Sequence, residues 1–298
     1  MDQTIFFTLV NSIEGRQAAR LLIDSLRSFG GELSRSPFWV FEADPKGAPC
    51  GELVQIGAQA IELQVPTTLK NYPFAGKVSA CAKAEALAAP EVSSLVWLNS
   101  GCLILQPPVD FKLGEAFDLA VRPVHIRNIG LPTDALVDPF WQRIYAQLDL
   151  QDVHLEVESF VDQQPLRAYF NSHLLSVNPS KRLFRHWLTY FERLVFDHDF
   201  QSGPCQDELH RIFLHQAVLS ALVAACCKPQ RIRILPPEYS YPYHLHQEIP
   251  PERRANALND LICIAYEDET LNPDTMNDIE IHEPLRSWLK ERLYHFPS

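Results

Sequence analysis

The chain has 298 residues, of which 46% are hydrophobic and 21% are charged. This composition supplies enough apolar side chains for a folded core, and it excludes a disordered or fibrous chain. The formal net charge of −11 argues against a nucleic-acid partner, because such proteins gain affinity from lysine and arginine contacts with phosphates.

The cysteines and the amino terminus indicate in which cellular compartment the protein is expected. The chain has 7 cysteines, and none stands in a Cys-x-x-Cys pair, so we expect reduced core thiols rather than a disulfide framework or a zinc ribbon. The apolar run at residues 5–10 lacks a preceding basic segment and is too short to cross a bilayer. We therefore expect a cytoplasmic protein without a transmembrane segment.

The hydrophobic pattern alternates strands and helices along the chain. It begins with a strand at residues 4–10, followed by Ser12 as a helix cap and an amphipathic helix at 16–29. Further strands are expected at 37–41, 60–65, 94–98, 103–105, 118–124, 169–179, 232–235 and 261–266, and further helices at 77–89, 181–194, 207–225 and 285–294.

This order predicts an α/β fold with a mixed, mostly parallel central sheet flanked by helices. We expect one domain over residues 1–270 and a C-terminal helical tail over 271–298. Residues 127–164, which are rich in proline, aspartate and aromatic side chains, are expected to be the variable region on the substrate side.

Four stretches carry a family resemblance. Residues 96–105 read Val-Trp-Leu-Asn-Ser-Gly-Cys-Leu-Ile-Leu, which is an apolar strand, a polar turn and a second apolar strand. The others are Tyr-Phe-Asn-Ser-His-Leu-Leu at 169–175, Phe-Leu-His-Gln-Ala-Val-Leu at 213–219, and Ile-Leu-Pro-Pro-Glu-Tyr at 234–239. In this order they resemble the GT-A class of nucleotide-sugar glycosyltransferases, and the resemblance covers most of residues 4–266.

The departures from that family concern the metal. The family's Asp-x-Asp pair supplies carboxylates that anchor Mg²⁺ or Mn²⁺ against the sugar diphosphate, but Asn99 and Gly101 stand in its place here. His215 replaces an aspartate of the family, and the late strand at 262–266 has no histidine ligand. The sequence therefore predicts no tightly bound metal, with Mg²⁺ or Mn²⁺ bound weakly at most.

Without a metal, positively charged side chains must stabilise the departing diphosphate. Arginine binds phosphate oxygens in pairs, and lysine provides a point charge. We expect Lys77, Lys83, Arg122 and Arg127 to do this, with His125 on the same strand face as Arg127.

The resemblance also implies where the donor binds. Thr8 to Asn11 and Asp44 follow the first two strands and would lie at the nucleotide edge of the sheet. Asn99 and Ser100 would line the donor pocket.

Three residues match family positions that touch the transferred sugar or the acceptor: Asn171, Ser172 and Gln216. We expect Gln216, Asn171 and Arg127 to be the catalytic residues. The leading hypothesis is transfer of a sugar from a nucleotide-diphosphate donor to a hydroxyl acceptor. The competing hypothesis is an inactive GT-A-like binding or scaffold protein, which the missing carboxylates favour.

Other patterns allow different sites. Asp197 and Asp199 form a literal Asp-x-Asp, but they follow a helix rather than a buried strand. On an extended chain, His244, His246 and Glu248 would share one face and could bind a metal. Alternating tyrosines could stack a sugar ring if they lay on an exposed edge; they are Tyr239, Tyr241 and Tyr243.

Overall fold

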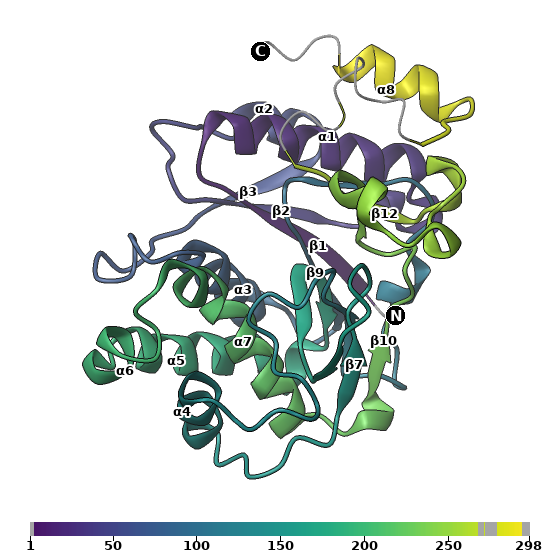
Figure 1. The fold of residues 1–298 in the computed structure, drawn as a ribbon. Helices are drawn as coiled ribbons and strands as arrows, with labels where there is room; N and C mark the ends of the chain where they lie inside the picture. The colour runs from purple at the N-terminus through teal and green to yellow at the C-terminus, as the bar shows by residue number, and fades with distance from the viewer. Residues whose placement is uncertain (1–2, 268–270, 272–278, 294–298) are drawn as a thin grey trace.

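The computed structural model describes residues 3–267, 271 and 279–293. Its centre is a seven-stranded sheet of order β10-β6-β9-β4-β1-β2-β3 (Figure 1). All neighbouring strands are parallel except β9, which runs antiparallel to both β4 and β6. The strands are β1 (Gln3–Val10), β2 (Phe38–Glu42), β3 (Ala58–Glu62), β4 (Val92–Leu98), β6 (Leu119–Pro123), β9 (Phe170–Val177) and β10 (Ile232–Ile234).

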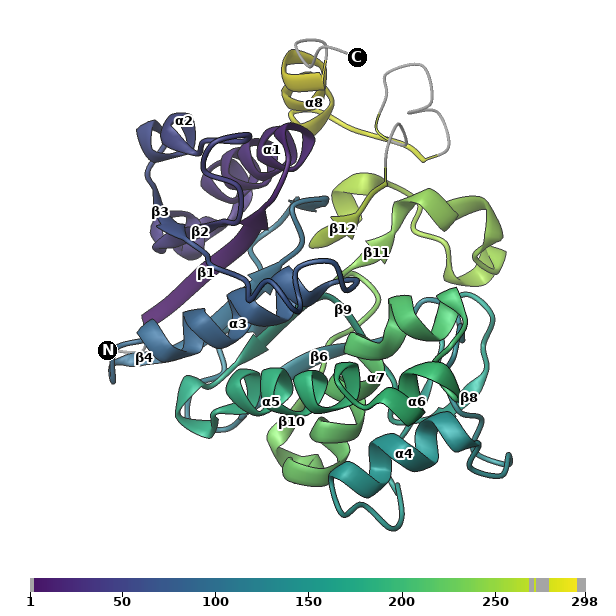
Figure 2. The same ribbon diagram turned by 90° about the vertical axis from the view of Figure 1, so that its left-hand side faces the viewer.

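Helices cover both faces of this sheet (Figure 2). The bounds are α1 (Ile13–Phe29), α2 (Gly51–Gln55), α3 (Ala75–Leu87), α4 (Pro139–Gln147), α5 (Leu183–Val195), α6 (His198–Ser202) and α7 (Glu208–Cys226). The alternation of β1 sends Ile5 and Phe7 into a core with α3, α5 and α7, whereas Phe6 and Val10 pack with α1 on the other face. Both faces are therefore apolar, as the continuous hydrophobic strands predict.

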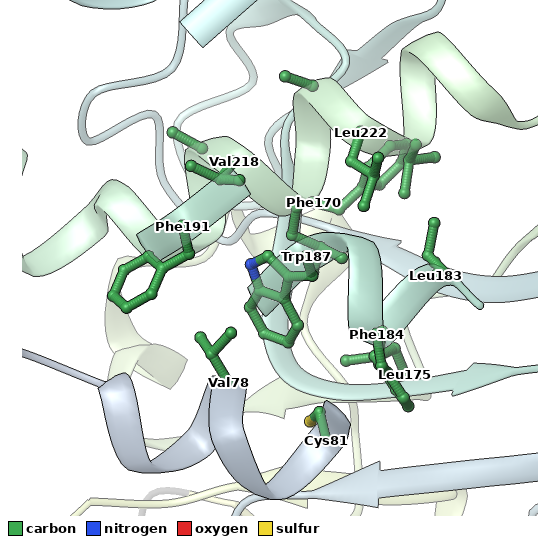
Figure 3. Close-up of a cluster of buried hydrophobic side chains, with 14 of the residues drawn as sticks. Val78, Cys81, Phe170, Leu175, Leu183, Phe184, Trp187, Phe191, Val218 and Leu222 are labelled. Carbon is green, nitrogen blue, oxygen red and sulfur yellow. The ribbon is translucent and has the colours of Figure 1, made fainter. Parts of the chain in front are cut away.

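The core beneath α3, α5 and α7 is built around Trp187 (Figure 3). Its indole contributes to a cluster with Val78 of α3 and Phe191 of its own helix. The indole Nε1 donates a hydrogen bond to the carbonyl of His215, 2.7 Å away on α7. The same side chain thus fills the core and fixes the helix that carries His215.

Helix α7 is apolar around most of its circumference. By length and composition it is the one helix of the described chain that could cross a membrane. More than half of it is buried inside the protein, which is the expected state of a central helix in a folded core.

Two smaller sheets extend the fold. A three-stranded sheet joins β11 (Tyr241–Pro242), β12 (Cys263–Ala265) and β5 (Cys102–Ile104), and a two-stranded sheet joins β7 (Glu156–Glu158) and β8 (Pro165–Arg167). Helix α8 (Leu285–Leu293) packs over α1 (Figure 1). There Trp288 Nε1 lies 2.9 Å from Ser28 Oγ, and its ring meets Phe29 edge to face.

The predicted α/β class and mostly parallel sheet are confirmed, and each strand and helix expected from the pattern has a counterpart. The pattern named no helix or strand within 127–164, yet α4 and β7 lie there. Asp138 caps α4 by accepting a hydrogen bond from the Trp141 amide, and a proline opens its first turn. Of the predicted tail, residues 272–278 and 294–298 lie outside the described residues.

All seven cysteines are free, and five of them are buried, which agrees with the expectation of reduced core thiols. The exceptions are Cys226, which is exposed, and Cys227, which is partly exposed.

A buried carboxylate joins α3 to α5. Glu85 accepts hydrogen bonds from the amides of Phe184 and Arg185, at 3.1 and 2.9 Å, and so caps the start of α5. We expect Glu85→Ala to lower the free energy of unfolding by about 2–4 kcal/mol, because it leaves one buried and one partly buried amide without a partner. Urea denaturation measures this, with Glu91→Ala at an exposed position as the control. Equal losses in both variants would contradict the role of this cap.

Candidate functional site

The candidate site lies at the carboxyl edge of the sheet, where β4 ends and the antiparallel β9 begins. The amide of Asn99 donates to the carbonyl of His173 at 2.7 Å, so the turn after β4 lies beside the first residues of β9. Ligands of open α/β sheets bind at this edge.

Gly101 explains in part why the Asp-x-Asp pair is missing. Its carbonyl accepts a hydrogen bond from the amide of Tyr266 at 3.0 Å. A Cβ atom at this position would lie 3.0 Å from the Tyr266 carbonyl oxygen, which is closer than ordinary contact. The close approach of two backbones thus disfavours any side chain at the second position of the pair.

Lys77 is the charged centre of the site. It is 4% exposed and lies on α3, with Nζ 3.2 Å from Ser172 Oγ and 3.3 Å from the Ser172 carbonyl oxygen. Nζ also lies over the rings of Phe74 and Trp97, 4.6 and 5.9 Å from their centroids. Burial lowers the pKa of Lys77 to about 8. Within the described residues, no carboxylate forms an ion pair or hydrogen bond with this ammonium group.

Ser172 connects Lys77 to a neutral histidine. Burial and the charge of Lys77 hold the pKa of His215 well below its ordinary value. Its Nδ1 lies 2.9 Å from the Ile212 carbonyl and must carry the proton, so Nε2 accepts from Ser172 Oγ at 2.9 Å. Gln216 Oε1, 3.4 Å from Ser172 Oγ, then keeps an unused lone pair.

Asn171 keeps a free donor in the same way. Its Oδ1 accepts from the amide of His173 at 2.6 Å, which fixes the orientation of the side-chain amide. Its Nδ2 lies 3.1 Å from His125 Nε2, but that nitrogen lies 2.7 Å from the Ser240 carbonyl and must donate to it. Two donors cannot satisfy each other, so the Asn171 amide group retains an N–H for a ligand.

Sequence reasoning did not assign a role to His173. Burial, with the nearby charge of Lys77, lowers its pKa to about 3, and its Nδ1 is buried without a hydrogen-bond partner in the described chain. His244 Nδ1 is another such atom. In the resembling family a glycine occupies the position of His173, and this difference in the sequence could have drawn attention to the residue. The sequence singled out His244 only as a candidate metal ligand, together with His246 and Glu248.

The other predicted cations are held elsewhere. Lys83 Nζ donates to the Glu62 carbonyl at 2.6 Å, at the end of β3. Arg127 is exposed, and its Nε donates to the Gly130 carbonyl within its own loop. Arg122 is buried against the ring of Phe160. The structure therefore brings Lys77 to Ser172, whose hydroxyl also lies beside His215 and Gln216. The side chain of Asn171, the preceding residue of β9, contacts His125 instead. The four predicted cations do not form one cluster.

The residues predicted at the nucleotide edge occupy several environments. Thr8 is fully buried, and its hydroxyl has no hydrogen-bond partner among the described residues. It shares the α1 face of β1 with Phe6, so it does not lie on the Lys77 face. Asn11 is exposed at the end of β1, and the carboxylate of Asp44 accepts from the Gly47 amide in an exposed turn.

The residues near the turn after β4 do not fit a divalent ion. Asn99 and Ser100 offer neutral oxygens, and Gly101 offers no side chain, whereas Mg²⁺ and Mn²⁺ favour carboxylates. Over residues 3–267, 271 and 279–293, no group of three or more His, Cys, Asp or Glu side chains is arranged to hold a metal.

The alternative metal patterns do not form in the described chain. Residues Tyr243–Glu248 form a 3-10 helix rather than an extended segment, so the expected shared face of His244, His246 and Glu248 is lost. Asp197 instead caps α6 and pairs with Arg143.

The three alternating tyrosines do not lie on an exposed edge, which corrects that alternative. Tyr239, Tyr241 and Tyr243 are buried. Tyr239 accepts from the Asp110 amide at 2.9 Å, and Tyr241 lies 2.7 Å from His246 Nδ1. Their rings therefore belong to the core.

A cavity of about 590 Å³ lies at the opposite edge, lined in part by Glu85, Val92 and Asn178. It adjoins the start of β4 and the end of β9, so it is not part of the polar group around Lys77.

A family model described as the Rhodobacterales glycosyltransferase domain matches residues 6–226. The chain belongs to this family. It has the GT-A fold of nucleotide-sugar glycosyltransferases, and the matched residues include Lys77, Asn171, Ser172 and Gln216. No curated protein matches the sequence.

Solved structures share the fold of this glycosyltransferase-family chain. The galactosyltransferase LgtC, in complex with donor and acceptor sugar analogs, matches 99% of this chain and 97% of its own at 11% identity, with a TM-score of 0.58. An active-site variant of LgtC matches 99% and 98% at 12% identity, with a TM-score of 0.52. The bifunctional glycosyltransferase WbbM matches 98% of this chain and 52% of its own at 12% identity, with a TM-score of 0.56.

The buried ammonium group of Lys77 has a consequence for stability. Its pKa is about 8 in the folded protein against 10.5 ordinarily, so below pH 8 the cost of burying the charge is fully present, at about 3 kcal/mol. Between pH 8 and 10.5 the folded state binds fewer protons than the unfolded state, so stability rises and the cost disappears.

We therefore expect Lys77→Met to raise the free energy of unfolding at pH 7 by about 1–3 kcal/mol, with the gain shrinking towards pH 10.5. Urea unfolding of both proteins across this pH range measures the effect. Lys228→Met, at an exposed position, is the matched control. A gain that does not change with pH would show that Lys77 is not a desolvated cation.

Proposed function

We propose that this protein transfers a sugar from a nucleotide-diphosphate donor to a hydroxyl acceptor, with Lys77 beside the donor phosphates in place of a tightly bound metal. Membership of a glycosyltransferase family supports sugar transfer as the class of activity. The observation that carries the finer proposal is the buried ammonium group of Lys77, which has neutral neighbours and no carboxylate partner in the described chain.

The chemistry requires a cation at this place. As the bond between the sugar C1 and the diphosphate oxygen breaks, its electron pair stays on the diphosphate, which gains negative charge. The acceptor oxygen forms the new bond to C1 and gives up its proton. A cation held in a desolvated site stabilises the growing charge more strongly than one in water, and it needs little reorganisation at the moment of reaction.

Two amide side chains, one beside Ser172 and one beside His125, fit the sugar rather than the phosphates. The unused N–H of Asn171 suits a sugar hydroxyl as acceptor, and the free lone pair of Gln216 suits one as donor. A glutamine is also the residue replaced in the active-site variant of LgtC, where glutamate takes its place. We place Asn99 and Ser100 at the donor pocket and the ends of β1 and β2 at the nucleotide.

Donor affinity should fall as Lys77 loses its proton. Above the Lys77 pKa of about 8, we expect the affinity for the tightest-binding nucleotide sugar to fall about tenfold per pH unit, because the phosphates themselves no longer titrate there. Calorimetric titration from pH 6.5 to 9.5 measures this.

The variants sharpen the assignment. Lys77→Met should weaken binding at pH 7 and remove the pH dependence, whereas Lys228→Met should change neither. If Arg127→Glu abolished binding while Lys77→Met left it unchanged, the phosphates would face the 127 loop instead of α3.

Metal dependence and hydrolysis separate the enzyme from a scaffold. We expect a panel of nucleotide sugars to include one that binds equally well with EDTA and with Mn²⁺, and that is slowly hydrolysed without an acceptor. Binding that requires Mn²⁺ would refute the role of Lys77. Binding without hydrolysis or transfer would instead favour the inactive scaffold, for which the absence of carboxylates at Asn99 and Gly101 is the supporting observation.

A further inference from the structure

A second polar pocket lies beside the candidate site. Its volume is about 350 Å³, which falls at the lower end of the range of about 300–1,000 Å³ for small-molecule pockets. It receives no residue from α3, the helix that carries Lys77. It is lined by Arg122, Glu158, Phe160, Pro237, Glu238 and Arg253.

The two arginines of this pocket differ in their partners. Arg253 is held by Glu158, with Nη2 2.6 Å from Oε1, and by the Phe160 carbonyl at 3.4 Å. Arg122 is 5% exposed, and its Nε is buried without a hydrogen-bond partner in the described chain. Its guanidinium carbon lies 5.0 Å from the centroid of the Phe160 ring, which holds the group in place without neutralising it.

A buried guanidinium group that lacks an anion is costly. Burial lowers the pKa of Arg122, and the charge of Glu238, which lies on the same pocket, raises it by a smaller amount. Glu238 is exposed, however, and forms no ion pair with Arg122 in the described structure. The planar fork of arginine matches the two oxygens of a carboxylate. The guanidinium group of Arg122 is thus suited to an anion of this shape.

We infer that this pocket binds the carboxylate-bearing sugar of an acidic saccharide acceptor. Arg122 pairs with the carboxylate of that sugar. The carboxylates of Glu158 and Glu238 accept hydrogen bonds from its hydroxyl groups, and the apolar surfaces of Phe160 and Pro237 face its ring. That this saccharide is an acceptor rests on the proposed function. That the pocket binds an acidic saccharide does not.

The backbone ties this pocket to the candidate site. The amides of Phe160 and Val161 donate to the carbonyls of Val124 and His125, at 3.0 and 2.7 Å. The His125 ring in turn donates to the Ser240 carbonyl, two residues beyond Glu238, and lies against Asn171. A saccharide seated on Arg122 would therefore lie next to the residues that we place at the transferred sugar.

The test compares glycosides that differ only in the anionic group. We expect methyl glucuronide to bind at least about tenfold more tightly than its neutral methyl ester, as a charge-assisted hydrogen bond requires, when both are titrated into the full chain and followed by NMR. Methyl glucoside 6-phosphate, titrated in the same way, shows whether the pocket prefers a phosphate group to a carboxylate. Tighter binding of the phosphate, or equal binding of the acid and its ester, would overturn the inference.

Two charge-neutralising variants form a matched pair within the pocket. Arg122→Gln should remove the preference for the acid, whereas Glu238→Gln should keep or strengthen it by removing a competing carboxylate. Arg122→Lys keeps the charge but loses the planar guanidinium group, so its preference for the acid should lie between those of the two glutamine variants. It replaces Arg122→Gln in the test if that variant does not fold. A preference that survives both Arg122 changes would overturn the role of Arg122.

Donor binding distinguishes this inference from the proposed function. We expect Arg122→Gln to leave the calorimetric affinity for the selected nucleotide sugar within about threefold of the parent, since no hydrogen bond or ion pair of the described structure joins Arg122 to Lys77, Ser172 or Gln216. If that affinity collapsed with Arg122→Gln, Arg122 would belong to the donor site and the acceptor assignment would fail. If no nucleotide sugar bound at all while the Arg122-dependent preference for methyl glucuronide remained, the proposed function would fail and the pocket would stand.

Discussion

The candidate site depends on the contact between the ammonium group of Lys77 and Ser172. A lysine buried to this extent ordinarily loses its charge or finds a carboxylate. Here one serine supplies two oxygen acceptors, 3.2 and 3.3 Å away, and two aromatic rings face the ammonium group. Burial lowers the pKa only to about 8, so most of the molecules carry the charge at neutral pH. The protein therefore holds a positive charge in place before any ligand arrives.

The histidines around this charge are arranged to stay neutral. Burial and the nearby lysine lower the pKa values of His173 and His215, and the carbonyl of Ile212 fixes the tautomer of His215. A second positive charge beside Lys77 would repel the first, and a carboxylate would neutralise it. A site of neutral donors and acceptors around one cation is thus consistent with a ligand that brings its own negative charge.

The sequence predicted the sheet well because its strands are continuous apolar runs bounded by turn residues, which tertiary packing rarely overrides. It also named Lys77, Ser172 and Gln216, which α3, β9 and α7 bring into one polar group, although their roles stay a prediction. It did not separate Arg122 from Lys77, since the distance between β6 and α3 depends on how β9 inserts between β6 and β4. Nor did it indicate which amide or ring nitrogen would be left unpaired, because that depends on tautomers and orientations set by contacts such as Ser240 with His125.

The antiparallel direction of β9 has a further consequence. Because Pro123 at the end of β6 pairs with Phe170 at the start of β9, residues 124–169 leave the sheet and return to it at the same point. This excursion holds α4, β7 and one wall of the Arg122 pocket, yet it interrupts no strand of the sheet. Its length can therefore change without breaking the sheet, although the side chains of α4 that pack into the core must still match α7. Exchanging this excursion between related chains, with α4 kept, would thus change one wall of the Arg122 pocket and leave the order of strands in the sheet intact.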